Sequence, residues 1–230
     1  MLAPPAPPST EQLLTLLQKT LGHELPNQLI AVQGLAGLLD LEAGASLNPE
    51  CQDYLHRLSA AAQRAHETIR ALGDFLRAFR TDRPIIRISV AEMVREVRAE
   101  IAGCFPGVTL EVDFPTPPPF LALPAFALRQ IVLHLLRHAH QASVNGGKIV
   151  TASGIVTPNG VELRIHDGGP SLTPDQQAKL FDPLAWRGLA TPFGLGLELA
   201  RQLLANWGAT FAVQSDDAGN TLIAFFPTPG

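Results

Sequence analysis

Two long stretches with an apolar residue at every third or fourth position place the strongest limits on the fold. In the first stretch these residues are Leu14, Leu17, Leu21, Leu25, Val32, Leu35 and Leu39, and in the second they are Leu55, Leu58, Ala62, Ala65, Ile69, Leu72, Leu76 and Phe79. This spacing predicts two amphipathic helices, one ending near Glu42 and the other near Arg80. A single pair of such helices cannot cover both apolar faces, whereas two copies packed as a four-helix bundle can. We therefore expect a helical hairpin that makes the protein a homodimer.

Turn and capping residues divide the chain into segments. Residues 1–9 are rich in proline, and we expect a stiff, disordered tail. Residues 10–81 contain the hairpin, in which Asn48 and Pro49 suit the cap and the first turn of the second helix. The sequence Thr-Asp-Arg-Pro at 81–84 breaks the helical pattern, so we expect a second domain over residues 84–230.

The apolar period of the second domain changes repeatedly, which is typical of a mixed α/β structure. We expect strands at 85–88, 108–112, 120–123, 148–156, 161–165, 210–214 and 221–226, and helices at 90–101, 125–142 and 195–207. Residues 171–191 are expected to be irregular. The predicted fold class is therefore α + α/β.

His23, Glu24 and Asn27 lie close together on the first predicted helix. A neutral imidazole is a nucleophile, and an adjacent carboxylate can accept its second ring N–H and make the free nitrogen more reactive. The amide of Asn27, one turn from His23, can orient a water against a phosphoryl group on that ring. These residues form a candidate phosphoryl site. The alternative is a plain helical hairpin in which His23 is an incidental surface residue.

Two glycine-containing segments of the second domain suit a nucleotide. Asp167 follows a predicted strand and precedes Gly168 and Gly169, so its carboxylate can accept a hydrogen bond from a planar ring such as an adenine. Gly194 and Gly196 open a predicted helix, where backbone N–H groups can approach a phosphate. Each segment alone also fits an ordinary tight turn.

His134 and His138 lie one turn apart on the predicted helix 125–142, which is a spacing found in metal sites. Because no carboxylate or cysteine lies at a useful spacing, polar positions lining a cleft are preferred over a zinc site. His23 lacks a second histidine four residues later, which excludes a zinc-protease helix there.

Composition excludes several classes of function. The formal net charge of −4 provides no basic surface for nucleic acid. The two cysteines, Cys51 and Cys104, are too few for a disulfide framework. Since no apolar run is long enough for a membrane span, and the first residues do not resemble a signal peptide, we expect a cytoplasmic protein.

In their order along the chain, these segments resemble the transmitter core of a two-component sensor histidine kinase, from about residue 10 to 227. The resemblance rests on a phosphoacceptor box at 23–27, an asparagine box at 128–142, a first glycine box at 167–170, a phenylalanine box at 180–183 and a second glycine box at 194–197. It implies a dimeric histidine-phosphotransfer domain followed by a Bergerat-type α/β sandwich of the GHKL class. His23 would exchange a phosphoryl group with a response-regulator aspartate, Glu24 would be its general base, and Asn27 would position a hydrolytic water.

For the second domain, the resemblance implies ATP and Mg²⁺ as cofactors. Asp167 would bind the adenine, and the pocket would be shaped by Gly169, Gly194 and Gly196. His134 and His138 stand where the family has two asparagines, the second of which normally holds Mg²⁺. Because oxygen ligands suit Mg²⁺ and imidazole nitrogen suits it poorly, this departure argues against efficient ATP use.

Three further departures concern backbone geometry. Ser171 and Pro192 replace glycines of the first and second glycine boxes, and a proline removes a backbone donor where a lid should hinge. Pro26 precedes Asn27, whereas the family has its proline after that position, and we expect a kink in the helix there.

Three functions remain open on this basis. The first is a phosphorelay protein that exchanges phosphoryl groups between His23 and a receiver domain, with weak or absent ATP use. The second is an active histidine kinase that phosphorylates His23 from Mg-ATP, and the third is a pseudokinase binding scaffold. The loss of both asparagines favours the first function over the second. A separate sensor or upstream kinase is expected to supply the input.

Overall fold

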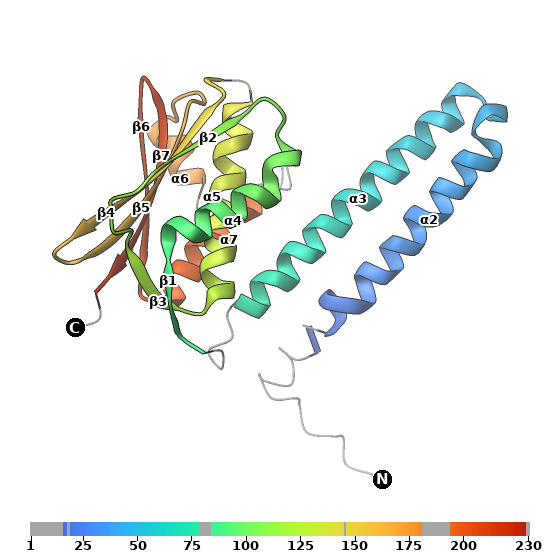
Figure 1. The fold of residues 1–230 in the computed structure, drawn as a ribbon. Coiled ribbons are helices and arrows are strands. Elements are labelled where there is room, and N and C mark those ends of the chain that lie inside the picture. Colours follow the sequence, from blue (N-terminus) through green and yellow to red (C-terminus); the bar gives the residue numbers. More distant parts are fainter. Residues whose placement is uncertain (1–15, 18, 79–83, 145, 181–193, 229–230) are drawn as a thin grey trace, which may run out of the picture. The chain divides into compact units, whose positions relative to one another are not determined.

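The computed structural model describes residues 16–17, 19–78, 84–144, 146–180 and 194–228. The chain divides into two compact units, Met1–Arg77 and Ala78–Gly230, which we call the helical unit and the α/β unit (Figure 1). The predicted proline-rich tail, the end of the second helix at Phe79, most of the phenylalanine box and Pro192 lie outside the described residues.

The helical unit is a hairpin, as its apolar spacing predicts. A π-helical turn, η1 (Thr20–Glu24), leads into α2 (Leu25–Ala43), and a 3₁₀ turn, η2 (Gly44–Ser46), connects α2 to the long helix α3 (Pro49–Ala78). Asn48 caps α3, because its Oδ1 accepts a hydrogen bond from the backbone N of Cys51 at 2.7 Å. Gln33 Nε2 donates to Gln63 Oε1 at 2.7 Å and links the two helices.

The π turn lies immediately before Pro26. Proline has no N–H and its ring clashes with the carbonyl four residues earlier, so an α-helical bond from residue 26 to Gly22 cannot form. The chain responds with a wider turn in which the backbone N of Leu25 donates to the carbonyl of Thr20, five residues earlier. The disturbance expected from Pro26 therefore takes the form of a π turn that contains His23.

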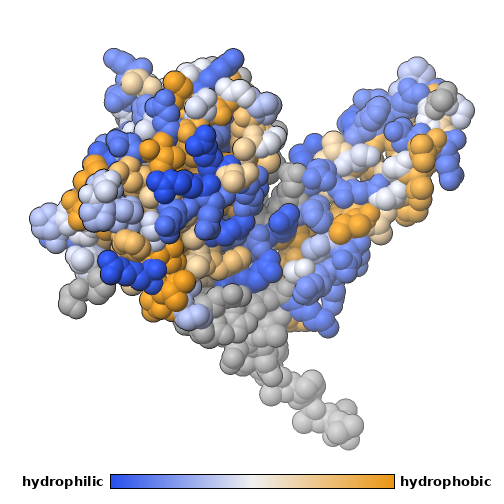
Figure 2. Space-filling view, in the orientation of Figure 1, coloured by the Kyte–Doolittle hydropathy of each residue, from blue (hydrophilic) through white to orange (hydrophobic). Residues whose placement is uncertain are grey.

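Helix α2 is apolar on more than one side. Ala36 is its one buried residue in the described chain, whereas Leu35, Leu38, Leu39 and Leu41 are between 49% and 83% exposed. The prediction of a single apolar stripe is wrong for this helix, because Ile30, Leu38 and Leu41 lie on the side opposite Val32 and Leu39. Figure 2 shows hydrophobic surface along the hairpin of α2 and α3.

The α/β unit contains a mixed five-stranded sheet of strand order β2-β4-β5-β7-β6. Its strands are β2 (Thr109–Asp113), β4 (Ile149–Thr157), β5 (Gly160–Asp167), β6 (Thr210–Asp216) and β7 (Gly219–Pro227). β2 pairs with β4 in parallel, and the other pairs are antiparallel. A separate antiparallel pair consists of β1 (Ile86–Ser89) and β3 (Phe120–Leu123).

Three helices cover one face of this sheet: α4 (Val90–Ile101), α5 (Ala125–Ser143) and α7 (Gly194–Asn206) (Figure 1). A 3₁₀ turn, η3 (Ala102–Cys104), follows α4. The core between sheet and helices is formed by side chains that are at most 1% exposed, among them Ile101, Leu128, Ile131, Leu135, Leu163, Ile165, Leu203 and Leu222. This two-layer α/β arrangement matches the predicted sandwich.

One α-helix of the described chain was not predicted. Residues 174–179 form α6 (Pro174–Lys179) inside the segment expected to be irregular. The Thr173 hydroxyl accepts from the backbone N of Gln176, and the Gln176 side chain accepts from the backbone N of Thr173, which is a capping box. The sequence Thr-Pro-Asp-Gln at 173–176 is therefore a local signal for the start of this helix.

Among the described residues, no helix combines the length and the apolarity needed to cross a membrane.

Candidate functional site

His23, Glu24 and Asn27 are all exposed on the helical unit. His23 and Glu24 belong to the π turn η1, and Asn27 lies in the first turn of α2. The Glu24 carboxylate lies 3.8 Å from Nζ of Lys19, in an ion pair of exposed side chains. The three predicted residues therefore face solvent within nine residues of chain that also carry the positive charge of Lys19, and a macromolecule can reach the imidazole.

Asp167 is the most strongly constrained polar residue of the α/β unit. It is the last residue of β5 and is fully buried. Its Oδ1 accepts hydrogen bonds from the backbone N of Gly169 and from Nδ2 of Asn220, both at 3.0 Å. Its Oδ2 is buried and has no hydrogen-bond partner among the described residues. Because a buried carboxylate oxygen without a donor is costly, Oδ2 is an acceptor suited to a donor from a ligand.

Asn220 holds Asp167 in place and was not foreseen from the sequence. It is 3% exposed, and its Nδ2 donates to Asp167 Oδ1 and to the carbonyl of Pro170 at 3.1 Å. Its Oδ1 accepts from the backbone N of Leu172 and from Ser215 Oγ. The pairing of Asp167 with Asn220 across β5 and β7 creates this contact. No local sequence signal reveals it, since the two residues are 53 positions apart.

Glycine is required beside this carboxylate. A Cβ atom at Gly169 would lie 2.8 Å from Asp167 Oδ1 and 2.9 Å from the Cβ of Ala142. A Cβ atom at Gly219, whose φ is +138°, would lie 1.9 Å from the Asp167 carbonyl oxygen. The turn after β5 and the turn before β7 therefore both pack closely against Asp167, and this packing fixes the direction of its side chain.

The structure brings His134 of α5 against Gly196 of α7. A Cβ atom at Gly196 would lie 3.2 Å from His134 Nδ1, so glycine lets the helix approach the imidazole. His134 is 6% exposed, and its Nε2 is buried without a hydrogen-bond partner in the part of the chain that the structure describes. Burial, assisted by the charge of Arg137, lowers the pKa of His134 to about 4. The imidazole is therefore neutral at pH 7.

His138 lies one turn after His134 and is influenced by Asp167. Burial lowers the pKa of His138, and the negative charge of Asp167 acts in the opposite direction. This electrostatic influence links the predicted asparagine-box position to the predicted adenine-binding carboxylate. Gly194 begins α7. Residues of α5, β5 and α7 that the sequence singled out therefore belong to one region of the α/β unit.

Gln130 extends this row of polar residues and was missed at the sequence level. It is 1% exposed, and its Nε2 has no hydrogen-bond partner among the residues described. Gln130, His134 and His138 stand at positions i, i+4 and i+8 of α5, so they share one side of the helix. We call these three residues the α5 polar row. Its spacing is the signal that would have identified Gln130.

This region suits the adenine base of a Mg-nucleotide better than it suits the metal ion. Asp167 offers a buried acceptor of the kind that an adenine amino group needs. At the predicted metal position His138 offers imidazole nitrogen, which suits Mg²⁺ poorly. Within the described residues, no cluster of three or more His, Cys, Asp or Glu side chains could hold a metal ion. The residues therefore fit the base and do not fit the metal.

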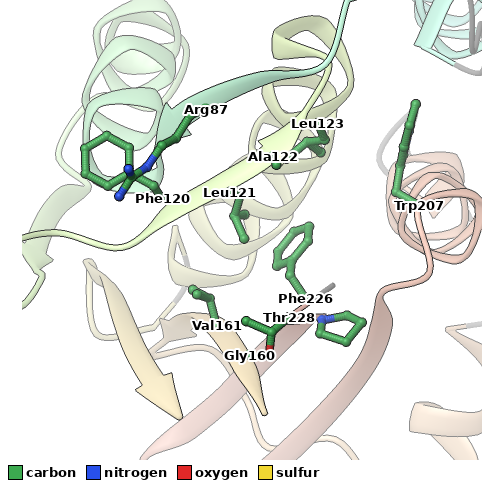
Figure 3. Close-up of a pocket in the computed structure, with 11 residues that line it drawn as sticks. Arg87, Phe120, Leu121, Ala122, Leu123, Gly160, Val161, Trp207, Phe226 and Thr228 are labelled. Atoms are coloured by element: carbon green, nitrogen blue, oxygen red, sulfur yellow. The ribbon is translucent and has the colours of Figure 1, made fainter. Parts of the chain in front are cut away.

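A hollow of about 240 Å³ lies at the other end of the sheet. Gly160, the first residue of β5, lines it, whereas Asp167 is the last residue of that strand. Figure 3 shows Leu121 of β3 and Phe226 of β7 on either side of it, and Arg87 beside Phe120, with its guanidinium carbon 4.5 Å from the ring centre. Its lining is largely apolar and contains none of the predicted site residues.

Comparison with known proteins identifies the α/β unit. The profile of the family described as "Histidine kinase-, DNA gyrase B-, and HSP90-like ATPase" matches residues 125–230, which include α5, Asp167 and α7. The chain is 23% identical over 237 residues to the sensory histidine kinase/phosphatase NtrB of Vibrio alginolyticus, covering 94% of this chain and 63% of that protein. The chain is similar to a histidine kinase transmitter core. The expected resemblance to a sensor histidine kinase is confirmed by this result.

Other relatives support the same assignment and show its extent. The probable sensor histidine kinase TcrY of Mycobacterium tuberculosis is 25% identical over 218 residues, which cover 90% of this chain and 44% of TcrY. Full-length ShkA, solved in complex with AMPPNP, has a TM-score of 0.67 at 22% identity and covers 97% of this chain and 47% of that one. The chain therefore spans about half the length of the kinases that it matches.

Proposed function

We propose that this transmitter core is a phosphorelay protein that carries a phosphoryl group on His23 and exchanges it with an aspartate of a response-regulator receiver domain. The observation that carries the proposal is the exposed His23, flanked by exposed Glu24 and Asn27, in a chain whose other unit belongs to the histidine kinase-type ATPases. The relatives named as sensor kinases support the two-component setting.

The residues of the helical unit account for each step of the transfer. A ring nitrogen of His23 attacks the phosphorus of the aspartyl phosphate, so that a P–N bond forms, the P–O bond breaks and the aspartate carboxylate leaves. Glu24 accepts the second ring N–H and stabilises the positive charge that develops on the imidazole. In the hydrolytic direction, Asn27 orients the water that attacks the phosphoryl group.

The apolar surface of α2 supports a dimer. Leu35, Leu38, Leu39 and Leu41 are exposed leucines within two turns of helix. An uncovered apolar surface of this kind on a helical hairpin is stabilised when a second copy covers it, as in a four-helix bundle. We propose that a homodimer presents two copies of His23 to the receiver domains.

The α/β unit would hold the base of ATP through Asp167, with Gly169, Gly194 and Gly196 giving close backbone approach. When bound, ATP supplies a phosphoryl group for His23. The metal position argues against efficient use of that group, because His138 replaces an oxygen ligand and metal charge dominates phosphoryl transfer. An active kinase is therefore the second candidate, supported by the buried acceptor on Asp167.

One assay separates these functions. Purified protein is incubated first with γ-labelled ATP and Mg²⁺ or Mn²⁺, and separately with a receiver domain labelled on its aspartate. Label that moves from the receiver to the protein, with none from ATP, is the expected result for a phosphorelay. Label from ATP would establish the kinase instead, and label from neither donor would indicate a binding scaffold.

The control is a second exposed histidine of the same unit. His23→Gln is expected to abolish labelling from the receiver domain, whereas His56→Gln, on the exposed side of α3, is expected to retain it. Labelling that survives His23→Gln would overturn the assignment of the phosphoacceptor.

A further inference from the structure

The α5 polar row places buried neutral side chains on the side of the helix that carries the predicted metal position, His138. His134 and Gln130 are at least 94% buried, and a side-chain nitrogen of each lacks a hydrogen-bond partner within the described chain. Both atoms come from the helix that also carries His138, whose ring is influenced by the Asp167 charge. Buried polar atoms without partners are rare in folded proteins and indicate a site for a ligand or for ordered water.

The charge of this region does not favour a triphosphate. The His134 imidazole is neutral at pH 7, because burial and Arg137 lower its pKa to about 4. The negative charge of Asp167 acts on His138, and the positive charge of Arg137 acts on His134. A triphosphate without its metal brings several negative charges into a region that contains the Asp167 carboxylate, and the neutral imidazole of His134 does not compensate them. Binding energy must then come mainly from the base.

The carboxylate is arranged to select that base. Asp167 Oδ1 already accepts two hydrogen bonds, from Gly169 and Asn220, so Oδ2 is the atom available to a ligand. A carboxylate oxygen accepts a hydrogen bond from the amino group of adenine and repels the carbonyl oxygen that guanine has at the same ring position. The neutral polar row supplies further donors and acceptors without requiring a cation.

We propose that the α/β unit binds adenine-containing ligands through the base and without a divalent cation, so that adenosine and ATP bind with similar affinity. The inference rests on the nucleotide-binding part of the proposed function and specifies its ligand class. In this respect the site differs from one that holds ATP by its metal-bridged phosphates.

The test is calorimetric titration of the full chain with adenosine, with ATP in EDTA and with ATP in MgCl₂. We expect the three affinities to agree within about threefold, and guanosine to bind at least about tenfold more weakly than adenosine. An ATP affinity that rises tenfold or more with Mg²⁺ would overturn the proposal. Failure of all three adenine ligands to bind would overturn it as well.

Two variants locate the effect. Asp167→Asn keeps an acceptor at Oδ1 and places an N–H donor at the Oδ2 position, so every adenine ligand should lose about tenfold or more in affinity. Asp113→Asn, which changes an exposed carboxylate on β2 of the same unit, is the matched control and should change nothing. Equal losses in the two variants would contradict recognition by Asp167.

The third variant tests the role of His138. His138→Asn restores an amide oxygen at the metal position, and we expect ATP binding to become about tenfold stronger with Mg²⁺ while adenosine binding stays unchanged. An ATP affinity that still ignores Mg²⁺ would show that His138 does not exclude the metal. Phosphotransfer from the receiver to His23 needs no nucleotide, so its failure beside intact adenosine binding would overturn the proposed function and leave this inference supported.

Discussion

At Asp167 the two oxygens of one buried carboxylate have different surroundings. Oδ1 is fixed by Gly169 and Asn220, and Oδ2 remains for an external donor. Asn220 also accepts from Leu172 and Ser215, so its amide connects the turn after β5 with β6 and β7. A side-chain amide whose donors and acceptor all have partners makes a rigid network, and here this network fixes the direction of the Asp167 carboxylate.

Replacing Asn220 tests this arrangement. Asn220→Ala removes one donor from Asp167 and leaves the backbone N of Leu172 without its acceptor, and we expect a loss of about 1–3 kcal/mol in the free energy of unfolding. The affinity for adenosine should fall as well, because the Asp167 carboxylate is then held only by the hydrogen bond from the backbone N of Gly169. Urea unfolding followed by tryptophan fluorescence measures the first effect, and Asn206→Ala at the exposed end of α7 is the control. Equal stability of the two variants would contradict the role of Asn220.

Gly169 gives a second prediction at this scale. A methyl group at this position would collide with Asp167 Oδ1 and Ala142, so Gly169→Ala is expected to destabilise the α/β unit by about 1–3 kcal/mol. Gly103→Ala is the matched control, because nothing lies within 4 Å of its Cβ position. Thermal unfolding of both variants measures the difference, and unchanged stability of Gly169→Ala would show that the turn can move.

The depressed pKa of His134 predicts a pH dependence. In the unfolded chain the imidazole titrates near its usual pKa of 6.5, whereas in the folded unit its pKa is about 4. Between these values the unfolded state binds more protons, so the stability falls as the pH drops from 7 towards 4. Replacement by a residue that does not titrate, His134→Asn, should remove about 2 kcal/mol of the loss between pH 7 and pH 5. Urea titrations at both pH values measure it, and equal losses in the two proteins would contradict the prediction.

Among the elements, α2 is the one whose surface exceeds what a hairpin can bury. The Gln33–Gln63 hydrogen bond links α2 to α3 and Ala36 is buried, whereas leucines remain exposed on other sides of α2. In a four-helix bundle each helix contacts two neighbours, which accounts for apolar residues on two sides of the same helix. We therefore propose that the exposed leucines of α2 form the contact between two copies of the chain.

Polar replacements on α2 test this point. The double variant Leu35→Gln, Leu39→Gln is expected to convert a dimer into a monomer of 24.6 kDa, because it removes apolar surface that only a second copy can cover. Sedimentation equilibrium measures the mass. Ile155→Thr with Val156→Thr, two exposed residues of β4, is the control and should leave the dimer intact. A monomeric wild-type protein would contradict the prediction directly.

The elements were largely predictable because their signals are local. The cap at Asn48 begins α3, and Ser89, whose hydroxyl accepts from the backbone N of Glu92, begins α4. Strand alternation placed β2 and β3 within one residue of their observed bounds. The short helix α6 was missed although Thr173 and Gln176 spell its capping box.

What remained hidden depends on pairing between distant segments. The contact of Asn220 with Asp167 follows from the register of β5 with β7, and the contact of Gly196 with His134 follows from the packing of α7 on α5. Neither register nor helix packing is encoded in a short stretch of sequence. The sequence thus identified the candidate residues, but it did not reveal the contacts that hold Asp167 or the burial of His134.

In the whole molecule, the unfolding of the two compact units is expected to be followed by different spectroscopic probes. Both tryptophans, Trp186 and Trp207, lie in the α/β unit, whereas circular dichroism at 222 nm also reports the helical unit. If the helical unit folds as a dimer, its melting temperature rises with protein concentration by mass action, and that of the α/β unit does not. Melting curves over a hundredfold range of concentration test this expectation. Concentration-independent curves from both probes would argue against a dimer that forms through the helices.

The strand order has a consequence for how the α/β unit is made in the cell. β7, the last strand of the unit, lies inside the sheet between β5 and β6, and it also delivers Asn220. During translation the sheet stays incomplete, and Asp167 unclamped, until the final strand has left the ribosome. A premature stop codon near residue 218 would therefore remove β7 and prevent the entire unit from closing.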